Sequence, residues 1–108
     1  MVEPNLSNIN HMNPAYLDVD IQRYENRVEW YRTFNKNITE NLLDWHYDGR
    51  RTIEIMQSGN SWGVQFEGSE PIVLHEGDIL ESPEKVLHRA IKFDDKSDLI
   101  LKITEYND

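Results

Sequence analysis

Two histidines and the carboxylates near them are the residues of this chain best suited to chemistry. His46 and Asp48 stand two apart just before Gly49, Glu54 follows them, and His88 lies further along the chain. Side chains two apart on a β-strand point to the same face. His46, Asp48 and Glu54 therefore share a face if their strand is unbroken, and His88 can join them if its own strand lies alongside. Two imidazoles and one carboxylate with open positions form the set preferred by non-haem Fe(II), and the set also suits Mn, Ni or Zn.

These residues also have purely structural interpretations. A histidine in a β-domain is more often hydrogen-bonded than a ligand, and Asp48 before Gly49 is a natural turn residue. The joint spacing of the three side chains, rather than any one of them, favours a metal site. Gly49 can also introduce a bulge, which would change the face on which the following residues lie.

The composition limits the kinds of partner. The chain has 108 residues, enough for one domain, and a formal net charge of −9. That charge argues against a nucleic-acid or anionic-membrane partner. The absence of cysteine excludes disulfides, thiolate nucleophiles and zinc–sulfur sites. Because there is no basic and apolar leader and no apolar run of about 18 residues, we expect a cytoplasmic protein without a membrane span.

Short β-strands must position these residues. Alternating apolar and polar side chains, separated by turn signals, indicate an all-β sandwich or barrel rather than βαβ units. The predicted strands or extended runs cover residues 28–34, 42–47, 52–56, 62–66, 72–74, 77–79, 86–93 and 99–106.

The N-terminal part has a different pattern. Asn13-Pro14 is typical of a helix start, and apolar residues recur behind it at helical spacing. This pattern predicts a short helix over residues 14–25. The polar residues 1–13 are expected to be loosely ordered.

The chain resembles the cupins, a family of small double-stranded β-helix barrels. Gly77, Pro83 and His88 keep the spacing of the family's second motif. His46 and Gly59 stand at the first histidine and the closing glycine of its first motif.

Two departures from the first motif concern the metal. Asp48 stands where the family has its second histidine, and Thr52 stands where it has a glutamate, with Glu54 two residues later. Residues 28–106 carry the resemblance, and the same run is similar to short uncharacterised cupin-like proteins of marine microbes and phages.

The resemblance implies a cupin double-stranded β-helix (jelly-roll barrel) over residues 28–108. We expect an N-terminal arm or short helix over residues 1–27 to precede it, and a homodimer to form through the aromatic strand 28–34. Inside the barrel we predict a divalent metal ion, Fe, Mn, Ni or Zn. Its predicted ligands are His46, Asp48 and His88, with Glu54 as fourth ligand or catalytic acid/base.

Gln65 and Arg50 are the predicted substrate contacts. Gln65 points away from the apolar side chains of its strand, toward the barrel mouth, and Arg50 lies beside the site. The predicted function is metal-dependent chemistry of the oxygenase or isomerase type on a small molecule. The alternative is a metal-free cupin that binds a small ligand, a sugar or an anion approached by Arg50 or Arg51, without catalysis.

Overall fold

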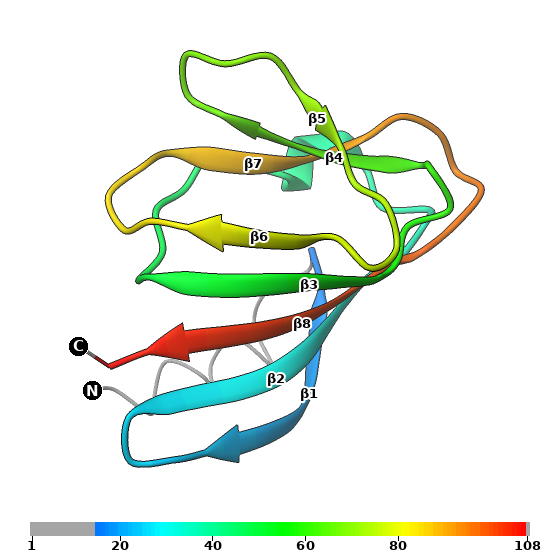
Figure 1. The fold of residues 1–108 in the computed structure, drawn as a ribbon. Coiled ribbons are helices and arrows are strands. Elements are labelled where there is room, and N and C mark those ends of the chain that lie inside the picture. Colours follow the sequence, from blue (N-terminus) through cyan, green and yellow to red (C-terminus); the bar gives the residue numbers. More distant parts are fainter. Residues whose placement is uncertain (1–14, 108) are drawn as a thin grey trace.

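The computed structural model describes residues 15–107, which form two antiparallel β-sheets stacked face to face (Figure 1). This confirms the predicted all-β fold. The elements of the described chain are β1 (Leu17–Arg23), β2 (Arg27–Phe34), the short 3-10 helix η1 (Glu40–Leu42), β3 (Arg51–Gln57), β4 (Trp62–Phe66), β5 (Ile72–Val73), β6 (Ile79–Ser82), β7 (His88–Lys92) and β8 (Leu99–Tyr106). Within these residues, no helix is long and apolar enough to cross a membrane.

The strand order brings distant parts of the chain together. The larger sheet has the order β1-β2-β8-β3-β6, and the smaller sheet has the order β5-β4-β7. The C-terminal strand β8 therefore lies between β2 and β3 (Figure 1). Strand β7 belongs to the opposite sheet, so residues at its start can face the inner side of β3 across the sandwich.

The core follows the alternation of the sequence. β2 buries Trp30, Arg32 and Phe34, and β8 buries alternate residues from Leu99 to Ile103. Alternate side chains of a strand reach the same face, so these two strands line the space between the sheets. Burial of this apolar stripe is the main favourable term in folding such a sandwich.

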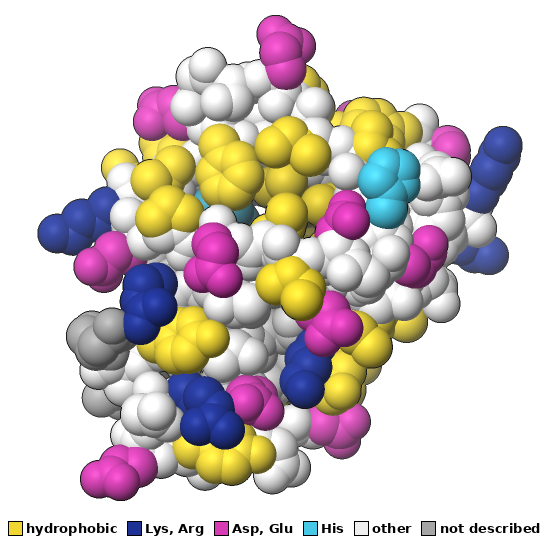
Figure 2. All heavy atoms as spheres, in the orientation of Figure 1, with side chains coloured by type: hydrophobic (Ala, Val, Ile, Leu, Met, Phe, Trp, Pro, Cys, Tyr) yellow, Lys and Arg dark blue, Asp and Glu magenta, His cyan; other side chains and the backbone are white. Residues whose placement is uncertain are grey.

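The two sheets are not joined by backbone pairing along one side of the sandwich. β5 and β6 are the outer strands on that side. They carry the exposed apolar residues Ile72, Val73 and Ile79. Figure 2 shows the apolar side chains gathered there, over β5 and β6.

The predicted helix over residues 14–25 is wrong, because residues 17–23 form β1 and pair with β2. Asp18 explains the difference. Its buried carboxylate accepts two hydrogen bonds from Arg32, at 2.7 and 2.9 Å, and the Arg32 guanidinium stacks on the ring of Tyr16 at 3.6 Å. These contacts with β2 override the local helix signal. The predicted looseness of residues 1–13 lies outside the described residues.

The predicted extended run over 42–47 is also wrong for most of its length. The segment holds the end of η1 and then a loop, with one isolated β-bridge between His46 and His88. Both backbone N–H···O bonds of this bridge measure 3.0 Å. The backbone of the loop therefore pairs with the smaller sheet at His46, which carries one of the candidate ligands.

Candidate metal centre

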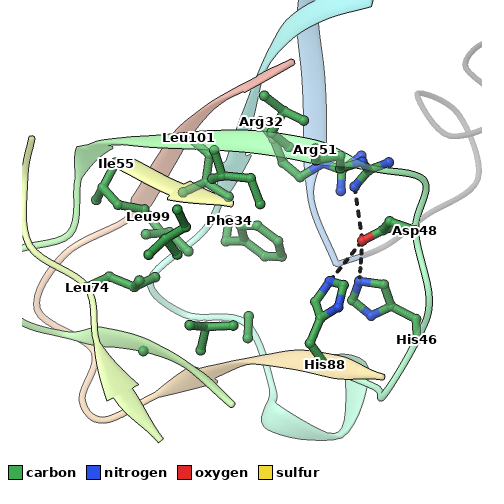
Figure 3. Close-up of a pocket in the computed structure, with 16 residues that line it drawn as sticks. Arg32, Phe34, His46, Asp48, Arg51, Ile55, Leu74, His88, Leu99 and Leu101 are labelled. Carbon is green, nitrogen blue, oxygen red and sulfur yellow. Dashed lines mark ion pairs between the residues drawn. The ribbon is translucent and has the colours of Figure 1, made fainter. Parts of the chain in front are cut away.

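His46, Asp48 and His88 converge at one end of the space between the sheets (Figure 3). The backbone bridge places the two imidazole rings with their centroids 4.5 Å apart. Asp48 follows His46 in the same loop and points back toward both rings. One candidate ligand atom from each residue lies within 4.8 Å of the others.

A single carboxylate oxygen is the meeting point of the cluster. Asp48 Oδ2 lies 3.2 Å from His46 Nε2 and 2.8 Å from His88 Nε2. Arg51 Nη1 approaches the same oxygen at 3.2 Å, and Arg51 Nε donates to Glu105 Oε1 at 2.6 Å. Arg51 therefore holds Asp48 in place from the side opposite the histidines.

The second nitrogen of each imidazole has a backbone partner. His46 Nδ1 lies 2.8 Å from the Asp44 carbonyl oxygen, and His88 Nδ1 lies 3.1 Å from the Val86 carbonyl oxygen. A carbonyl only accepts, so each Nδ1 carries a proton. Nε2 then donates to Asp48 only when the ring holds a second proton, and a neutral ring turns its Nε2 lone pair toward Asp48 instead. Lone pairs facing a carboxylate oxygen repel unless a proton or a metal ion lies between them.

The charges within the cluster favour the ionised carboxylate. Burial alone would raise the pKa of Asp48, but the hydrogen bonds from His46 and His88 and the charge of Arg51 outweigh burial and hold that pKa well below its usual range. The hydrogen bond to Asp48 also raises the pKa of His46 above its ordinary value, although burial opposes the shift. Asp48 is therefore charged at neutral pH, as a metal ligand must be.

The residues present fit a divalent metal. Two imidazoles and a carboxylate are a ligand set used for Fe(II), Mn(II), Ni(II) and Zn(II). Histidine ligands of metals almost always donate their other ring N–H to a carbonyl or carboxylate, as His46 and His88 do here. The triad would hold the ion, and the ion would offer its open positions to the space between the sheets.

That space is a mostly apolar pocket of about 70 Å³. Leu74, Leu99 and Leu101 form walls at the end away from the triad, with Phe34 between them and the histidines (Figure 3). The pocket is thus polar at one end and apolar elsewhere, an arrangement that is common in small-molecule sites.

Glu54 is not brought to the triad. Ile53 and Ile55 line the pocket, and Glu54 lies on the other face of β3, opposite Ile79 of β6 and Lys102 of β8. The reason is that β3 begins only at Arg51, so the side-chain alternation does not continue unbroken from His46. The odd-numbered residues of β3 face inward, which reverses the expected face.

The two predicted substrate contacts also lie away from the triad pocket. The Arg50 guanidinium stacks over the ring of Tyr106 at 4.4 Å. The Gln65 side-chain oxygen accepts hydrogen bonds from Arg89 at 3.0 and 2.9 Å. Gln65 lines a separate open pocket beside Trp45.

Two charged residues of the pocket, Arg32 and Arg51, are not among the site residues predicted for the metal-dependent function. Arg32 has a visible signal in the sequence, since it is a charged residue between Trp30 and Phe34 in an otherwise apolar alternating stripe. Arg51 is expected only beside Arg50, as an anion contact of the metal-free alternative, because its inward direction depends on where β3 begins.

Comparisons with known proteins support the fold. No protein-family model matches the chain, and no curated protein matches its sequence. Among solved structures, a putative mannose-6-phosphate isomerase from Ralstonia eutropha JMP134 is similar with a TM-score of 0.68 and 16% identity, covering 88% of this chain and 87% of that one.

Two further structures carry the fold in their descriptions. An RmlC-like cupin family protein with a double-stranded β-helix fold from Methanocaldococcus jannaschii has a TM-score of 0.67 and 13% identity, covering 89% of this chain and 84% of its own. A cupin domain from Bordetella pertussis Tohama I has a TM-score of 0.65 and 20% identity, covering 89% of this chain and 97% of its own.

Proposed function

Since the chain has the cupin double-stranded β-helix fold, we propose that it binds a divalent metal ion through His46, Asp48 and His88 and acts on a small molecule in the adjoining pocket. One observation carries the proposal. Two imidazole Nε2 atoms, each with its Nδ1 bound to a backbone carbonyl, converge on one carboxylate oxygen. A cation among these three atoms removes the repulsion that the neutral rings would otherwise face.

The reaction we propose is of the oxygenase or isomerase type. A bound metal would supply Lewis acidity and open positions for a substrate. The protein's own residues contribute the rest: Asp48 and the histidines hold the ion, Arg51 orients Asp48, and the apolar walls keep water away from the bound molecule. The similar structure described as a putative isomerase supports this class.

Metal analysis of protein purified without chelator tests the proposal. Wild type should contain one divalent ion per chain, or take one up from added Fe, Mn, Ni or Zn, and a His46→Ala/His88→Ala variant should not. Binding to the native state at 100 times Kd adds about 2.7 kcal/mol of stability. In a chain of this size that stabilisation raises Tm by about 10 °C or more.

A matched control shows whether the loss of metal is specific to His46 and His88 or follows the loss of any histidine. His75 lies outside the cluster, where its Nδ1 contacts the side chain of Asn60 at 3.1 Å. A His75→Ala variant should keep both the metal and the Tm rise. If wild type neither contains a stoichiometric metal nor gains stability from any of the four ions, the proposal is wrong.

A second candidate function is the metal-free binding of a small ligand. The observation in its favour is that Asp48 Oδ2 already contacts His46, His88 and Arg51. A proton in place of the metal satisfies the same cluster, which would then serve only as the polar end of a binding pocket. Absence of metal uptake in the experiment above selects this candidate.

A further inference from the structure

Two buried arginines stand beside the triad inside the pocket. Apart from the triad, Arg32 and Arg51 are the charged residues among those lining it. They are 5% and 7% exposed. Arg32 comes from β2 and Arg51 from β3, and their guanidinium carbons lie 5.7 and 5.2 Å from the centre of the Trp30 ring. Figure 3 shows both at the same end of the pocket as Asp48.

Each guanidinium has donors beyond its present bonds. Arg32 uses Nε and Nη2 on Asp18, and Arg51 uses Nε on Glu105 and Nη1 toward Asp48. A guanidinium carries five N–H donors in a fixed fork. Nη1 of Arg32 and Nη2 of Arg51 make no hydrogen bond to another described residue, so donors remain for an acceptor from outside the chain.

The indole of Trp30 gives an independent sign of a missing acceptor. Its Nε1–H is buried and has no hydrogen-bond partner among residues 15–107. Buried N–H groups are nearly always paired, with protein, water or ligand. The centre of the Trp30 ring lies 5.7 and 5.2 Å from the two guanidinium carbons, so this unpaired donor belongs to the same cluster of buried donors as Arg32 and Arg51.

The formal charges of the metal-loaded site are balanced by one additional monoanion. A divalent ion and two guanidinium groups face three carboxylates, those of Asp18, Asp48 and Glu105. One positive charge remains. Because an uncompensated buried charge is unfavourable, a monoanion fits this site better than a neutral molecule or a dianion.

We propose that the pocket binds a small monocarboxylic acid, with its carboxylate against Arg32 and Arg51 and its apolar part between the leucine walls. The proposal deepens the metal-dependent function and rests on it. Guanidinium forks match carboxylate geometry. The cavity of about 70 Å³ holds about five to seven non-hydrogen atoms, which limits the acid to a short chain.

Calorimetric titration of the Mn(II)-loaded full chain with butyrate and with butyramide tests the proposal. The two probes have the same shape and differ in charge. Butyrate should bind at least about tenfold more tightly, since hydrogen bonds to charged groups are the stronger class. An Arg32→Gln/Asp18→Asn double variant, which removes both members of the buried pair, should lose that preference and bind the two probes with similar affinity.

A surface arginine of the same strand provides the control. Arg27 on β2 pairs with Glu29 outside the pocket. An Arg27→Gln variant should keep the full preference for butyrate. Arg32→Lys keeps the charge but loses the fork, so it should show a smaller preference than wild type, and it serves as the test if the double variant does not fold.

Metal uptake, measured separately, distinguishes the two failures. If Mn(II) binds but butyrate is no tighter than butyramide, or the Arg32 variants keep the full preference of the wild type, the carboxylate inference is overturned and the metal function stands. If no metal binds, the metal function is overturned. The carboxylate inference falls with it, because without the divalent ion two guanidinium groups face three carboxylates and no positive charge remains for an anion.

Discussion

Asp48 is the residue on which the candidate site depends most. Its Oδ2 atom contacts both histidines and Arg51, and its side chain is 13% exposed. The low pKa of Asp48, to which the histidine hydrogen bonds and Arg51 contribute against burial, keeps it anionic across the physiological range. A neutral side chain of the same shape therefore removes the charge that the two imidazoles and the guanidinium share.

An Asp48→Asn variant should lose metal affinity by more than about 100-fold, because even partners behind the ligands change affinity by 10–100-fold. Metal titration monitored by Tm measures the loss. Asp44→Asn is the matched control, since the contact of Asp44 with His46 is made by the backbone carbonyl, which the substitution leaves in place. Equal metal affinity in Asp48→Asn and wild type would contradict the assigned ligand.

At the scale of the elements, β1 is held to the sheet by a buried ion pair. The Asp18 side chain is fully buried, and its two oxygens accept from Nε and Nη2 of Arg32. The strand itself is irregular, since its register with β2 shifts between Val19 and Gln22 and Asp20 has a φ of 57°. Side-chain contacts across the strands therefore matter more here than backbone regularity.

An Asp18→Asn variant should be destabilised by about 3 kcal/mol, because removing one partner leaves the other charge buried and unpaired. Urea unfolding monitored by tryptophan fluorescence measures the change. Asp20→Asn is the control on the same strand, because Asp20 is exposed and asparagine accepts a positive φ. A loss in Asp18→Asn no larger than in Asp20→Asn would show that the ion pair does not hold β1.

The turn between β3 and β4 depends on one exposed carboxylate. Glu76 Oε2 accepts from the backbone N–H groups of Ser58 and Gly59 at 2.7 and 2.9 Å. Gly59 has a φ of +61°, and a Cβ there would meet Ser97 Cβ at 2.6 Å, so glycine is required. These hydrogen bonds, that from Gly59 first, hold the pKa of Glu76 below its ordinary value of 4.5.

The lowered pKa of Glu76 predicts a pH-dependent contribution to stability. A carboxyl group with a depressed native pKa stabilises the fold above its unfolded pKa, and the contribution disappears as pH falls through the native pKa. Wild type should therefore have a higher Tm than Glu76→Gln at pH 7, and the difference should shrink below about pH 4.5. Glu70→Gln, at another exposed position, is the control for the removal of a surface carboxylate. A Tm difference that is constant with pH would contradict the role of the carboxylate.

At the scale of the whole molecule, the predicted homodimer cannot use strand 28–34 for backbone pairing. β2 is hydrogen-bonded to β1 on one side and to β8 on the other. β1 is the outer strand of this sheet, and its Leu17 and Val19 are exposed. The homodimer and the cytoplasmic location both remain predictions, and among the described strands of this sheet we expect a dimer to form through β1 rather than through β2.

Sedimentation equilibrium tests the dimer. Wild type is expected to sediment as a dimer and Val19→Lys as a monomer, because a lysine would place a charge in the apolar contact. Val73→Lys on β5 is the control, since Val73 is 41% exposed and Val19 is 40% exposed. A monomeric wild type at tens of micromolar concentration would rule the homodimer out.

The sequence alone determined the strands with strong alternation and the identity of the three candidate ligands. Trp30, Arg32 and Phe34 lie on one face because a strand repeats every two residues, and the structure places them there. His46, Asp48 and His88 also meet, but the strand expected to carry the first two is a loop, and the backbone bridge between His46 and His88 brings them together. The alternation of β2 depends on local periodicity, which is readable from one chain.

Only the tertiary structure decided where the alternation starts and which partner each strand has. β1 is a strand because Asp18 reaches Arg32, fourteen residues later in the chain. Glu54 faces away from the pocket because β3 begins at Arg51 rather than at His46, and a shift of one residue reverses every face. For the same reason Arg51, and not Arg50, stands beside the triad. Register and pairing arise from contacts between distant segments, and local sequence does not encode them.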